Sequence, residues 1–158
     1  GQMLTPQALY EKVRIDELDF LATGGGISFG GGEPLLYSDF LQEFRKLCGP
    51  DWHLCAETSL NVPWENVATA ADCIDYFYID CKDTDPDIYH RYTSQDNARM
   101  LSNLRRLLEI AGPERITVRI PLIPEINTKE DQIRSQKLLQ SMGVVNFDLF
   151  TYKTDILR

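Results

Sequence analysis

Charged side chains follow or end several short β-like runs of this 158-residue chain. The five that stand out are Glu33, Glu57, Asp80, Lys82 and Arg119. Carboxylates attract an ammonium group, whereas Lys and Arg attract a carboxylate. A set of mixed sign at one edge of a sheet therefore indicates a zwitterionic ligand. The same side chains could instead pair with one another in a structural salt-bridge network, and their spacing leaves both interpretations open.

Alternation along the runs predicts which way these charges point. Over residues 76–82, Asp80 and Lys82 share one face with two tyrosines, whereas the apolar residues and Cys81 share the other. Arg119 alternates with apolar neighbours in the same way. Because successive side chains of a strand point to opposite faces, the apolar faces are expected to pack on helices. The charged faces are then expected to line one shared interior or rim.

Two triple-glycine stretches, residues 24–26 and 30–32, flank the short run 27–29. Such stretches allow the backbone to approach a ligand or a neighbouring strand closely. A phosphate cradle would require a G-x-G-x-x-G or a Walker pattern, and neither can be read here. Glu33 directly against the second stretch opposes an anionic ligand and suits a cation or an ammonium group.

Short strands alternate with helical stretches along the chain. We expect five strands, at residues 27–29, 53–57, 76–80, 116–120 and 146–151. Helices are expected after Thr5-Pro6, over 40–48 up to Gly49-Pro50, after Pro63, around 100–108 up to Gly112-Pro113, and from an Asn127/Glu130 capping box to Met142 and Gly143. This order predicts a parallel sheet, either open and doubly wound or an arc of an α/β barrel. A closed eight-stranded barrel takes about 250 residues, so this chain could form only part of one.

The composition predicts a single globular domain over residues 1–158, with no linker or low-complexity segment. Sixteen Lys and Arg against 24 Asp and Glu give a formal net charge of −8. Such a surface repels polyanions, so neither nucleic acid nor an anionic membrane is predicted as a partner. No apolar run approaches the roughly 20 residues of a membrane span, and no signal peptide can be read. These features favour a cytoplasmic location.

Four cysteines stand at positions 48, 55, 73 and 81, and no pair has the C-x-x-C spacing of a zinc or redox site. Only two histidines accompany them. We therefore expect four reduced thiols and no metal site built from the chain's own residues.

The segment GGGISFGGGEPLL, residues 24–36, resembles the G-G-G-V-T-x-S-G-G-E-P-L-L segment of radical S-adenosylmethionine enzymes. More narrowly, it is similar to the branch that activates glycyl-radical enzymes, typified by pyruvate formate-lyase activating enzyme. The resemblance continues in order through Glu57-Thr58-Ser59, Asp80-Cys81-Lys82 and the run RIPLIP at 119–124 followed by Asn127. These motifs cover nearly the whole chain, which makes the ordered set far more specific than Gly-Gly-Glu-Pro alone.

The resemblance implies a partial (β/α) barrel of parallel strands with outer helices, of which this chain would supply five strands. It also implies that S-adenosylmethionine binds at the carboxyl ends of the strands. By position, Gly31, Gly32, Glu33 and Glu57 would face the amino group, Asp80 the ribose, and Lys82 with Arg119 the carboxylate. Lys153 stands beside Tyr152 where relatives often have a histidine, and the resemblance implies a cofactor contact there.

Besides Lys153, the chain departs from the family pattern in three places. The C-x-x-x-C-x-x-C loop that holds a [4Fe–4S] cluster is not found among the 158 residues, and we expect it to precede them. Gly30 replaces the serine of S-G-G-E, and Leu60 replaces a glycine that often follows Glu-Thr-Ser. The chain is thus interpreted as the central and C-terminal part of an activating enzyme, inactive by itself.

For the intact protein the resemblance implies reductive cleavage of S-adenosylmethionine by the cluster, with an electron donor such as flavodoxin or ferredoxin. The resulting 5′-deoxyadenosyl radical would take hydrogen from a backbone glycine of a partner glycyl-radical enzyme. Two alternatives stay open. One is a radical enzyme of the same superfamily that acts on a small molecule, as the deazapurine synthases do; the other is a non-catalytic binding domain whose polar rim is structural.

Overall fold

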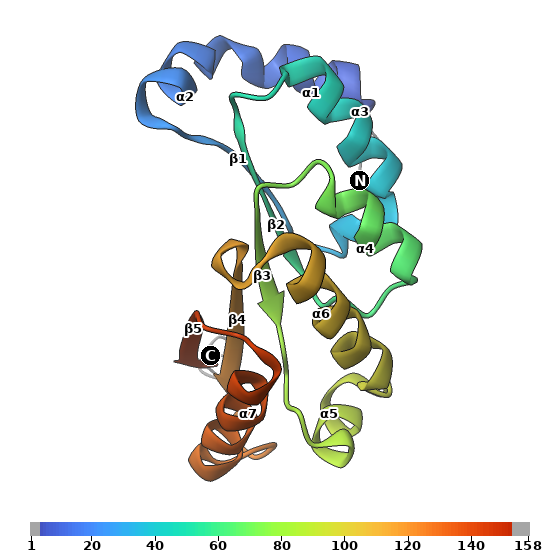
Figure 1. Cartoon of the computed structure of the whole chain (residues 1–158), viewed down its shortest axis with the longest axis vertical. Helices are drawn as coiled ribbons and strands as arrows, with labels where there is room; N and C mark the ends of the chain where they lie inside the picture. Colours follow the sequence, from blue (N-terminus) through green and yellow to red (C-terminus); the bar gives the residue numbers. More distant parts are fainter. Residues whose placement is uncertain (1–3, 153–158) are drawn as a thin grey trace, which may run out of the picture. The chain divides into compact units, whose positions relative to one another are not determined.

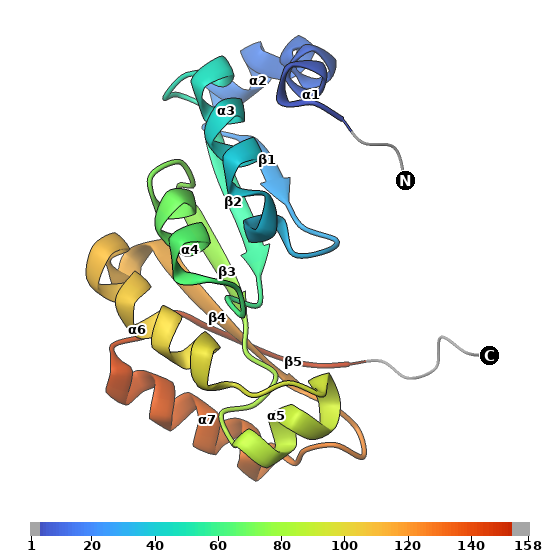
Figure 2. The same cartoon turned by 90° about the vertical axis from the view of Figure 1, so that its right-hand side faces the viewer.

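The chain folds around one sheet of five parallel strands, described over residues 4–152 of a computed structural model (Figures 1 and 2). The strand order in the sheet, β1-β2-β3-β4-β5, is the order of the chain. In an open doubly wound sheet the order reverses at a switch point, whereas in a barrel each strand lies beside the one before it. The consecutive order therefore decides between the two predicted architectures, and it confirms an α/β fold of the partial-barrel type.

The described residues divide into two compact units. The first comprises residues 4–58 with 62–77, and the second comprises residues 59–61 with 78–152. β3 (Tyr76–Asp80) contributes its first two residues to the first unit and the rest to the second. The expectation of a single domain over residues 1–158 stays a prediction.

The first unit holds the two leading strands and most of the predicted N-terminal helices. Its elements are α1 (Pro6–Val13), η1 (Arg14–Asp16), α2 (Glu17–Thr23), β1 (Gly26–Phe29), η2 (Pro34–Tyr37), α3 (Ser38–Cys48), β2 (His53–Thr58) and α4 (Trp64–Ala71). The predicted N-cap is confirmed, because the Thr5 hydroxyl oxygen accepts a hydrogen bond from the Ala8 N–H at 3.0 Å. α2 and the short helices η1 and η2 were not predicted from the sequence.

β1 and β2 run parallel, with Gly26 opposite His53. A Cβ at Gly26 would lie 1.8 Å from the His53 carbonyl oxygen, far inside van der Waals contact. The first triple-glycine stretch therefore serves the close approach of a neighbouring strand, which is one of the two roles expected for it.

The core of the first unit is aromatic around Trp52. This side chain is 1% exposed, and its ring centroid lies 5.5 Å from that of Tyr10, 4.9 Å from Phe20 and 6.0 Å from Phe44. The indole N–H donates to Glu17 Oε1 at 3.3 Å. One tryptophan thus fastens α1, α2 and α3 together.

Arg45 of α3 satisfies several backbone carbonyls of the first unit. Its guanidinium donates to the carbonyl oxygens of Gly49, Trp52 and Cys73, each at 2.9 Å. It also donates to Asp75 Oδ2 at 2.7 Å. Four charge-assisted contacts from one side chain connect the end of α3 to the chain before β2 and before β3.

The second unit holds the last strands and their covering helices. Its elements, besides the end of β3, are α5 (Pro86–Thr93), α6 (Ala98–Ala111), η3 (Pro113–Arg115), β4 (Ile116–Leu122), α7 (Lys129–Met142) and β5 (Phe147–Thr151). β4 and β5 run parallel, and α7 packs against β4. Fully buried core residues of this unit include Leu60, Ile79, Cys81, Met100, Leu104, Leu107, Ile116, Val118, Ile120 and Leu139. Sequence analysis did not predict α5, and it ended β4 two residues early.

The predicted capping box of α7 was wrong by one residue. Thr128, not Asn127, is the N-cap: its hydroxyl accepts from the Asp131 N–H at 3.1 Å, and Asp131 Oδ2 accepts from the Thr128 N–H at 2.8 Å. The physical reason is that the Asn127 side chain is already used, since its Oδ1 accepts from the Ile123 N–H at 2.7 Å. The predicted end of the helix at Gly143 is confirmed.

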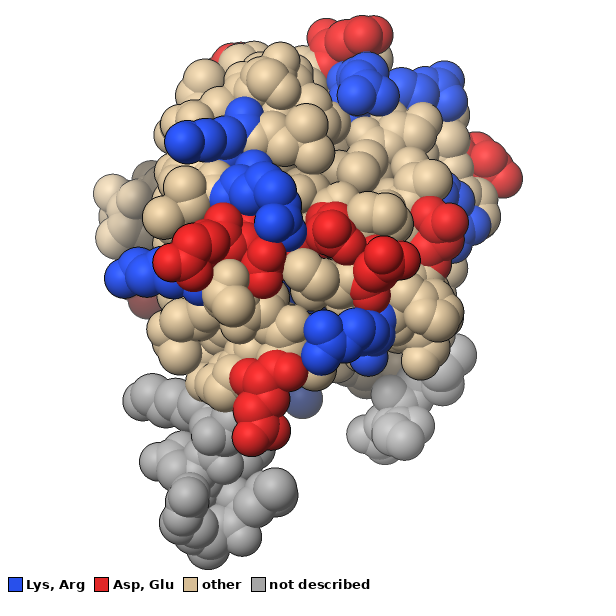
Figure 3. All heavy atoms as spheres, turned by 90° about the horizontal axis from the view of Figure 1, so that it is seen from below, with Lys and Arg blue, Asp and Glu red and all other residues tan. Residues whose placement is uncertain are grey.

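The surface carries charge of both signs. On the face shown in Figure 3, acidic and basic side chains lie interspersed. Among the described helices, none is both long enough and apolar enough to cross a bilayer.

Candidate functional site

The Gly-Gly-Glu loop of the first unit is anchored to the end of β2 through Glu33. This residue is the N-cap of η2, and its Oε2 accepts from the Leu35 N–H at 3.1 Å. The same oxygen accepts from the Thr58 hydroxyl at 2.7 Å. A half-buried carboxylate is thereby held in one orientation at the carboxyl end of two neighbouring strands.

Glu57 lies at this same edge, beside the loop that follows β1. A Cβ at Gly30 would lie 2.6 Å from Glu57 Oε2. The missing side chain at position 30 therefore makes room for the carboxyl group of Glu57. In the first unit Glu57 thus lies against Gly30 and Glu33 against Thr58, and that both carboxylates face one ligand stays a prediction.

The predicted alternation of β3 is confirmed in the burial of its side chains. Phe77, Ile79 and Cys81 are fully buried, whereas Asp80 and Lys82 are only partly buried. The Cys81 N–H donates to the Arg119 carbonyl oxygen at 3.0 Å. Asp80 and Lys82 therefore flank the point where the end of β3 meets Arg119 on β4.

Lys82 lies among aromatic side chains of the second unit. Its ammonium donates to the Tyr152 hydroxyl, and its Nζ lies 5.0 Å from the centroid of the Tyr152 ring and 5.8 Å from that of Tyr92. An ammonium at such distances from aromatic rings is attracted by their π-electrons.

Arg119 is paired with an acid of the neighbouring strand. Its Nε lies 3.5 Å from Asp148 Oδ2, the residue directly opposite it on β5. Its guanidinium carbon also lies 5.2 Å from the centroid of the Phe150 ring. A ligand carboxylate at this position would have to share the guanidinium with Asp148.

A buried polar network braces the loops that follow β3 and β4. The Asp83 carboxylate, which is 0% exposed, accepts from the Asn127 amide at 3.2 Å and from the Ser135 hydroxyl at 3.3 Å. Asn127 also donates to the Pro121 carbonyl oxygen at 3.1 Å. Burial raises the pKa of Asp83, although hydrogen bonds from the Asp85 N–H and from Asn127 oppose the rise. The asparagine of the sequence motif thus connects the segment after Lys82 to the end of β4.

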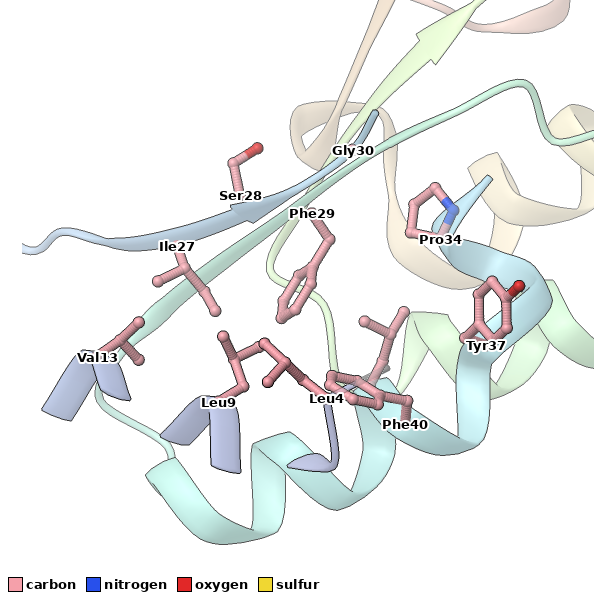
Figure 4. A pocket seen from close by; sticks show the side chains of 11 residues that line it. Leu4, Leu9, Val13, Ile27, Ser28, Phe29, Gly30, Pro34, Tyr37 and Phe40 are labelled. Atoms are coloured by element: carbon pink, nitrogen blue, oxygen red, sulfur yellow. The ribbon is translucent and has the colours of Figure 1, made fainter. Parts of the chain in front are cut away.

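A large cavity of about 660 Å³ in the first unit is not suited to a zwitterion (Figure 4). Ile27 and Phe29 of β1 point into it, whereas the Ser28 side chain points away. Most of the remaining lining is apolar and comes from α1, η2 and α3. The charged residues of the predicted site are not among the lining residues.

The described residues do not fit an iron–sulfur cluster. Within residues 4–152, no group of three or more His, Cys, Asp or Glu could hold a metal ion. Burial raises the pKa of all four thiols, to about 11 for Cys73 and about 12 for Cys81. Cluster ligation requires thiolates, which these environments disfavour.

The predicted site residues fall into two sets, one in each unit. The first unit holds Gly31, Gly32, Glu33 and Glu57, and the second holds Asp80, Lys82 and Arg119. That both sets line one cavity and bind one ligand stays a prediction. Lys153, the remaining candidate, lies outside the described residues.

Consecutive parallel strands, with charged side chains following their carboxyl ends, define the class of α/β-barrel domains that bind a ligand at that edge. The chain belongs to the radical S-adenosylmethionine (radical SAM) superfamily, whose family model matches residues 1–135. This match covers most of the chain and confirms the resemblance predicted from the glycine-rich motif.

Several curated relatives that the chain matches are activating enzymes. The chain is 35% identical over 136 residues to the (2S)-3-sulfopropanediol dehydratase activating enzyme of Klebsiella oxytoca. It is 34% identical over 134 residues to the indoleacetate decarboxylase activating enzyme of Tractidigestivibacter scatoligenes. These matches cover 85% and 84% of this chain but 42% of each relative. The chain therefore spans less than half the length of these two curated relatives.

Among solved structures, the fold is similar to a domain of pyruvate-formate lyase-activating enzyme from Bacteroides vulgatus. The TM-score is 0.58 at 24% identity, over 80% of this chain and 99% of that chain. This likeness supports the partial-barrel architecture derived from the strand order.

The structure gives a physical account of Leu60, where the family pattern often has glycine. Leu60 has a φ of 58°, in the left-handed region that glycine adopts most readily. Its side chain is fully buried, and its carbonyl oxygen accepts from the Asn103 amide at 2.8 Å. A leucine thus adopts here a backbone conformation that glycine adopts more readily.

Several residues that contact the predicted site residues were not singled out from the sequence, among them Thr58, Tyr152 and Tyr92. Thr58 was quoted within a motif but given no role, although it holds Glu33. Tyr152 was noted only as the neighbour of Lys153, and Tyr92 was not singled out. Tyr92 lies ten residues after Lys82 in a helix that was not predicted, so no local pattern could have connected the two.

Proposed function

We propose that this chain is part of an activating enzyme for a glycyl-radical enzyme. The observation that carries the proposal is the 35% identity to an activating enzyme over 85% of the chain. The similarity to a second activating enzyme at 34% supports it. The partner would be a glycyl-radical enzyme such as a pyruvate formate-lyase or a related lyase, and the electron donor a flavodoxin or ferredoxin.

In this proposal the residues of the chain bind and orient S-adenosylmethionine. Gly31, Gly32, Glu33 and Glu57 face its amino group, Asp80 faces the ribose, and Lys82 with Arg119 faces the carboxylate, with Lys153 as a further contact. The fixed orientation of Glu33 between Thr58 and Leu35 supports the first assignment, because a pre-oriented carboxylate needs little reorganisation to meet an ammonium group.

The redox chemistry would come from a [4Fe–4S] cluster bound by cysteines outside these 158 residues. When bound, cluster and cofactor together supply one-electron cleavage of the sulfonium and removal of hydrogen from a glycine of the partner. The chain's own part is to hold the amino acid and ribose groups in place and to exclude water. We also propose a cytoplasmic location; the free thiols of Cys48, Cys55, Cys73 and Cys81 are typical of a reducing compartment.

A non-catalytic binding domain is the second candidate, and one contact favours it. Arg119 already has a carboxylate partner in Asp148, as a purely structural network would require. A superfamily enzyme that acts on a small molecule remains the third candidate.

The deciding experiment uses the full-length protein, reconstituted anaerobically with iron and sulfide and reduced. With S-adenosylmethionine and a candidate glycyl-radical enzyme, we expect 5′-deoxyadenosine and methionine in equal amounts. We also expect the electron paramagnetic resonance doublet of a glycyl radical. Cofactor cleavage without a glycyl radical on any candidate partner would favour a small-molecule substrate. Absence of both binding and cleavage would favour the non-catalytic domain.

A further inference from the structure

Tyr152 is held in place by the sheet of the second unit. It follows β5 directly, and its N–H donates to the Leu122 carbonyl oxygen at 3.0 Å. That bond continues the β4–β5 ladder, in which Leu122 lies opposite Thr151. Strand pairing therefore fixes the backbone from which the Tyr152 ring projects.

The Lys82 ammonium lies close to the rings of Tyr152 and Tyr92. The two ring centroids are 6.1 Å apart, with an angle of 36° between the ring planes, and the Lys82 Nζ lies within 5.8 Å of both. The Tyr152 hydroxyl accepts a hydrogen bond from the ammonium. The Phe150 ring also packs against Tyr152, with ring centroids 5.3 Å apart.

The two cations of the predicted site in this unit, Arg119 and Lys82, have neighbours that differ in charge. Arg119 lies against the carboxylate of Asp148. Within residues 4–152, by contrast, the recorded partners of the Lys82 ammonium are the two neutral tyrosines, and no ion pair to it is found. Neutral aromatic partners fix the position of a cation without cancelling its charge. Lys82 therefore retains its attraction for an external carboxylate.

We propose that Tyr152 is a positioning residue that orients Lys82 for the carboxylate of the bound ligand. This inference rests on the proposed function, in which Lys82 faces the carboxylate of S-adenosylmethionine. Tyr152 acts through Lys82, by way of the hydrogen bond from the ammonium to its hydroxyl oxygen. Tyr92 contributes the face of its ring, and its hydroxyl has no part in the contact.

The first test needs no cofactor. In the full-length protein, the rate of acylation of the Lys82 amine by a small amine-reactive reagent is followed by mass spectrometry. We expect Tyr152→Phe to raise this rate, because the amine loses the hydroxyl that holds it. Tyr92→Phe, the matched control, keeps its ring and should leave the rate unchanged. Equal rates in the wild type and in Tyr152→Phe would overturn the proposal.

The second test is a double-mutant cycle on cofactor affinity. Tyr152→Phe should weaken binding of S-adenosylmethionine roughly threefold to tenfold when Lys82 is present. In a Lys82→Met background it should change the affinity no further, because Tyr152 has lost the group through which it acts. An effect of equal size in both backgrounds would show that Tyr152 does not act through Lys82, and it would overturn the proposal.

Thermal unfolding separates positioning from a structural role. The melting temperature of Tyr152→Phe should stay near that of Tyr92→Phe, and a large drop with unchanged affinity would overturn the proposal. If the wild-type protein bound no S-adenosylmethionine, the proposed function would fail, and the acylation rates alone would then decide the role of Tyr152.

Discussion

The Glu57 carboxyl group lies in the space that a side chain at Gly30 would fill, because a Cβ at Gly30 would come within 2.6 Å of Glu57 Oε2. The family pattern has serine at the first position, and this chain has glycine. Glycine at position 30 thus leaves room for the carboxyl group of a glutamate at position 57. Any side chain at position 30 must displace the end of Glu57, which is flexible and can rotate away.

Gly30→Ala should therefore move the Glu57 carboxylate with little loss of stability. Glu57 is half-buried, and the atom that a Cβ at position 30 would meet is the far end of its flexible side chain, so the free energy of unfolding should fall by about 1 kcal/mol or less. Affinity of the full-length protein for S-adenosylmethionine should fall about tenfold, as expected for the loss of a charge-assisted contact. Denaturant unfolding and calorimetry measure the two quantities.

Two further variants serve as controls for Gly30→Ala. Glu57→Asp in the Gly30→Ala background withdraws the carboxyl group and should recover part of the affinity. For stability, Gly32→Ala is the matched control, because a Cβ there meets no atom within 4 Å. If Gly30→Ala left affinity unchanged, Glu57 would have no role in binding the ammonium group.

Lys82→Met should weaken cofactor binding by the full-length protein about tenfold to a hundredfold. Methionine keeps most of the apolar stem and removes the charge, which corresponds to about 1.5–3 kcal/mol for a charge-assisted contact. The melting temperature should change little. A structural network predicts the reverse, namely unchanged affinity and a lower melting temperature, so calorimetry and thermal unfolding of this variant distinguish the two.

Asp83 should make stability depend on pH. Burial raises the pKa of Asp83 in the folded chain, so the folded state holds this proton more tightly than the unfolded state. The stabilisation is complete below the unfolded pKa of about 4 and is lost as pH rises through the folded pKa. Asp83→Asn replaces the titratable carboxyl group by an amide that does not ionise. Urea unfolding between pH 4 and 7 should show the variant gaining stability relative to wild type as pH rises; parallel profiles would refute this.

Arg45→Lys should lower the free energy of unfolding by about 2–4 kcal/mol. A lysine cannot supply the four hydrogen bonds that the guanidinium makes to three carbonyl oxygens and Asp75. The neighbouring Lys46 pairs with Glu43 on the exposed surface, so Lys46→Gln should cost less than about 1 kcal/mol. Equal effects of the two substitutions in chemical denaturation would show that the Arg45 contacts contribute little.

The 158-residue chain, treated anaerobically with iron and sulfide, should hold no stoichiometric [4Fe–4S] cluster. Burial raises the pKa of each of its four thiols, and cluster ligation needs thiolates. Iron content and visible absorption after desalting measure the outcome. A retained cluster spectrum would contradict the assignment of the cluster ligands to residues outside this chain.

Much of the fold could be predicted because its signals are local. The alternation over Tyr76–Asp80 and the Gly-Pro pairs after α3 and α6 are readable in the sequence, and each was found where expected. Helix α5 was missed although it opens with Asp85-Pro86, a cap signal of the same kind as Thr5-Pro6. Helix α2 was missed because it has no side-chain cap and is short, and short helices depend on tertiary contacts. One such contact is the hydrogen bond from the Trp52 indole to Glu17.

The candidate site was predicted by residue type and family pattern, but its contacts were not. The hydrogen bond between Lys82 and Tyr152 spans 70 residues of sequence. Asp148 is likewise placed opposite Arg119 by the register of two parallel strands. Long-range pairings of this kind depend on register, which residue periodicity does not determine.

The contacts of residues 59–61 limit the order in which parts of the chain can fold during synthesis. They precede the last part of the first unit in the sequence, yet they belong to the second. The Leu60 carbonyl oxygen is bonded by Asn103, and Arg99 Nη2 donates to the Asn61 carbonyl oxygen at 2.7 Å. Both donors lie on α6, about 40 residues downstream. As the chain leaves the ribosome, these two bonds to the segment that follows Glu57 and Thr58 can form only after the first part of α6, through Asn103, has emerged.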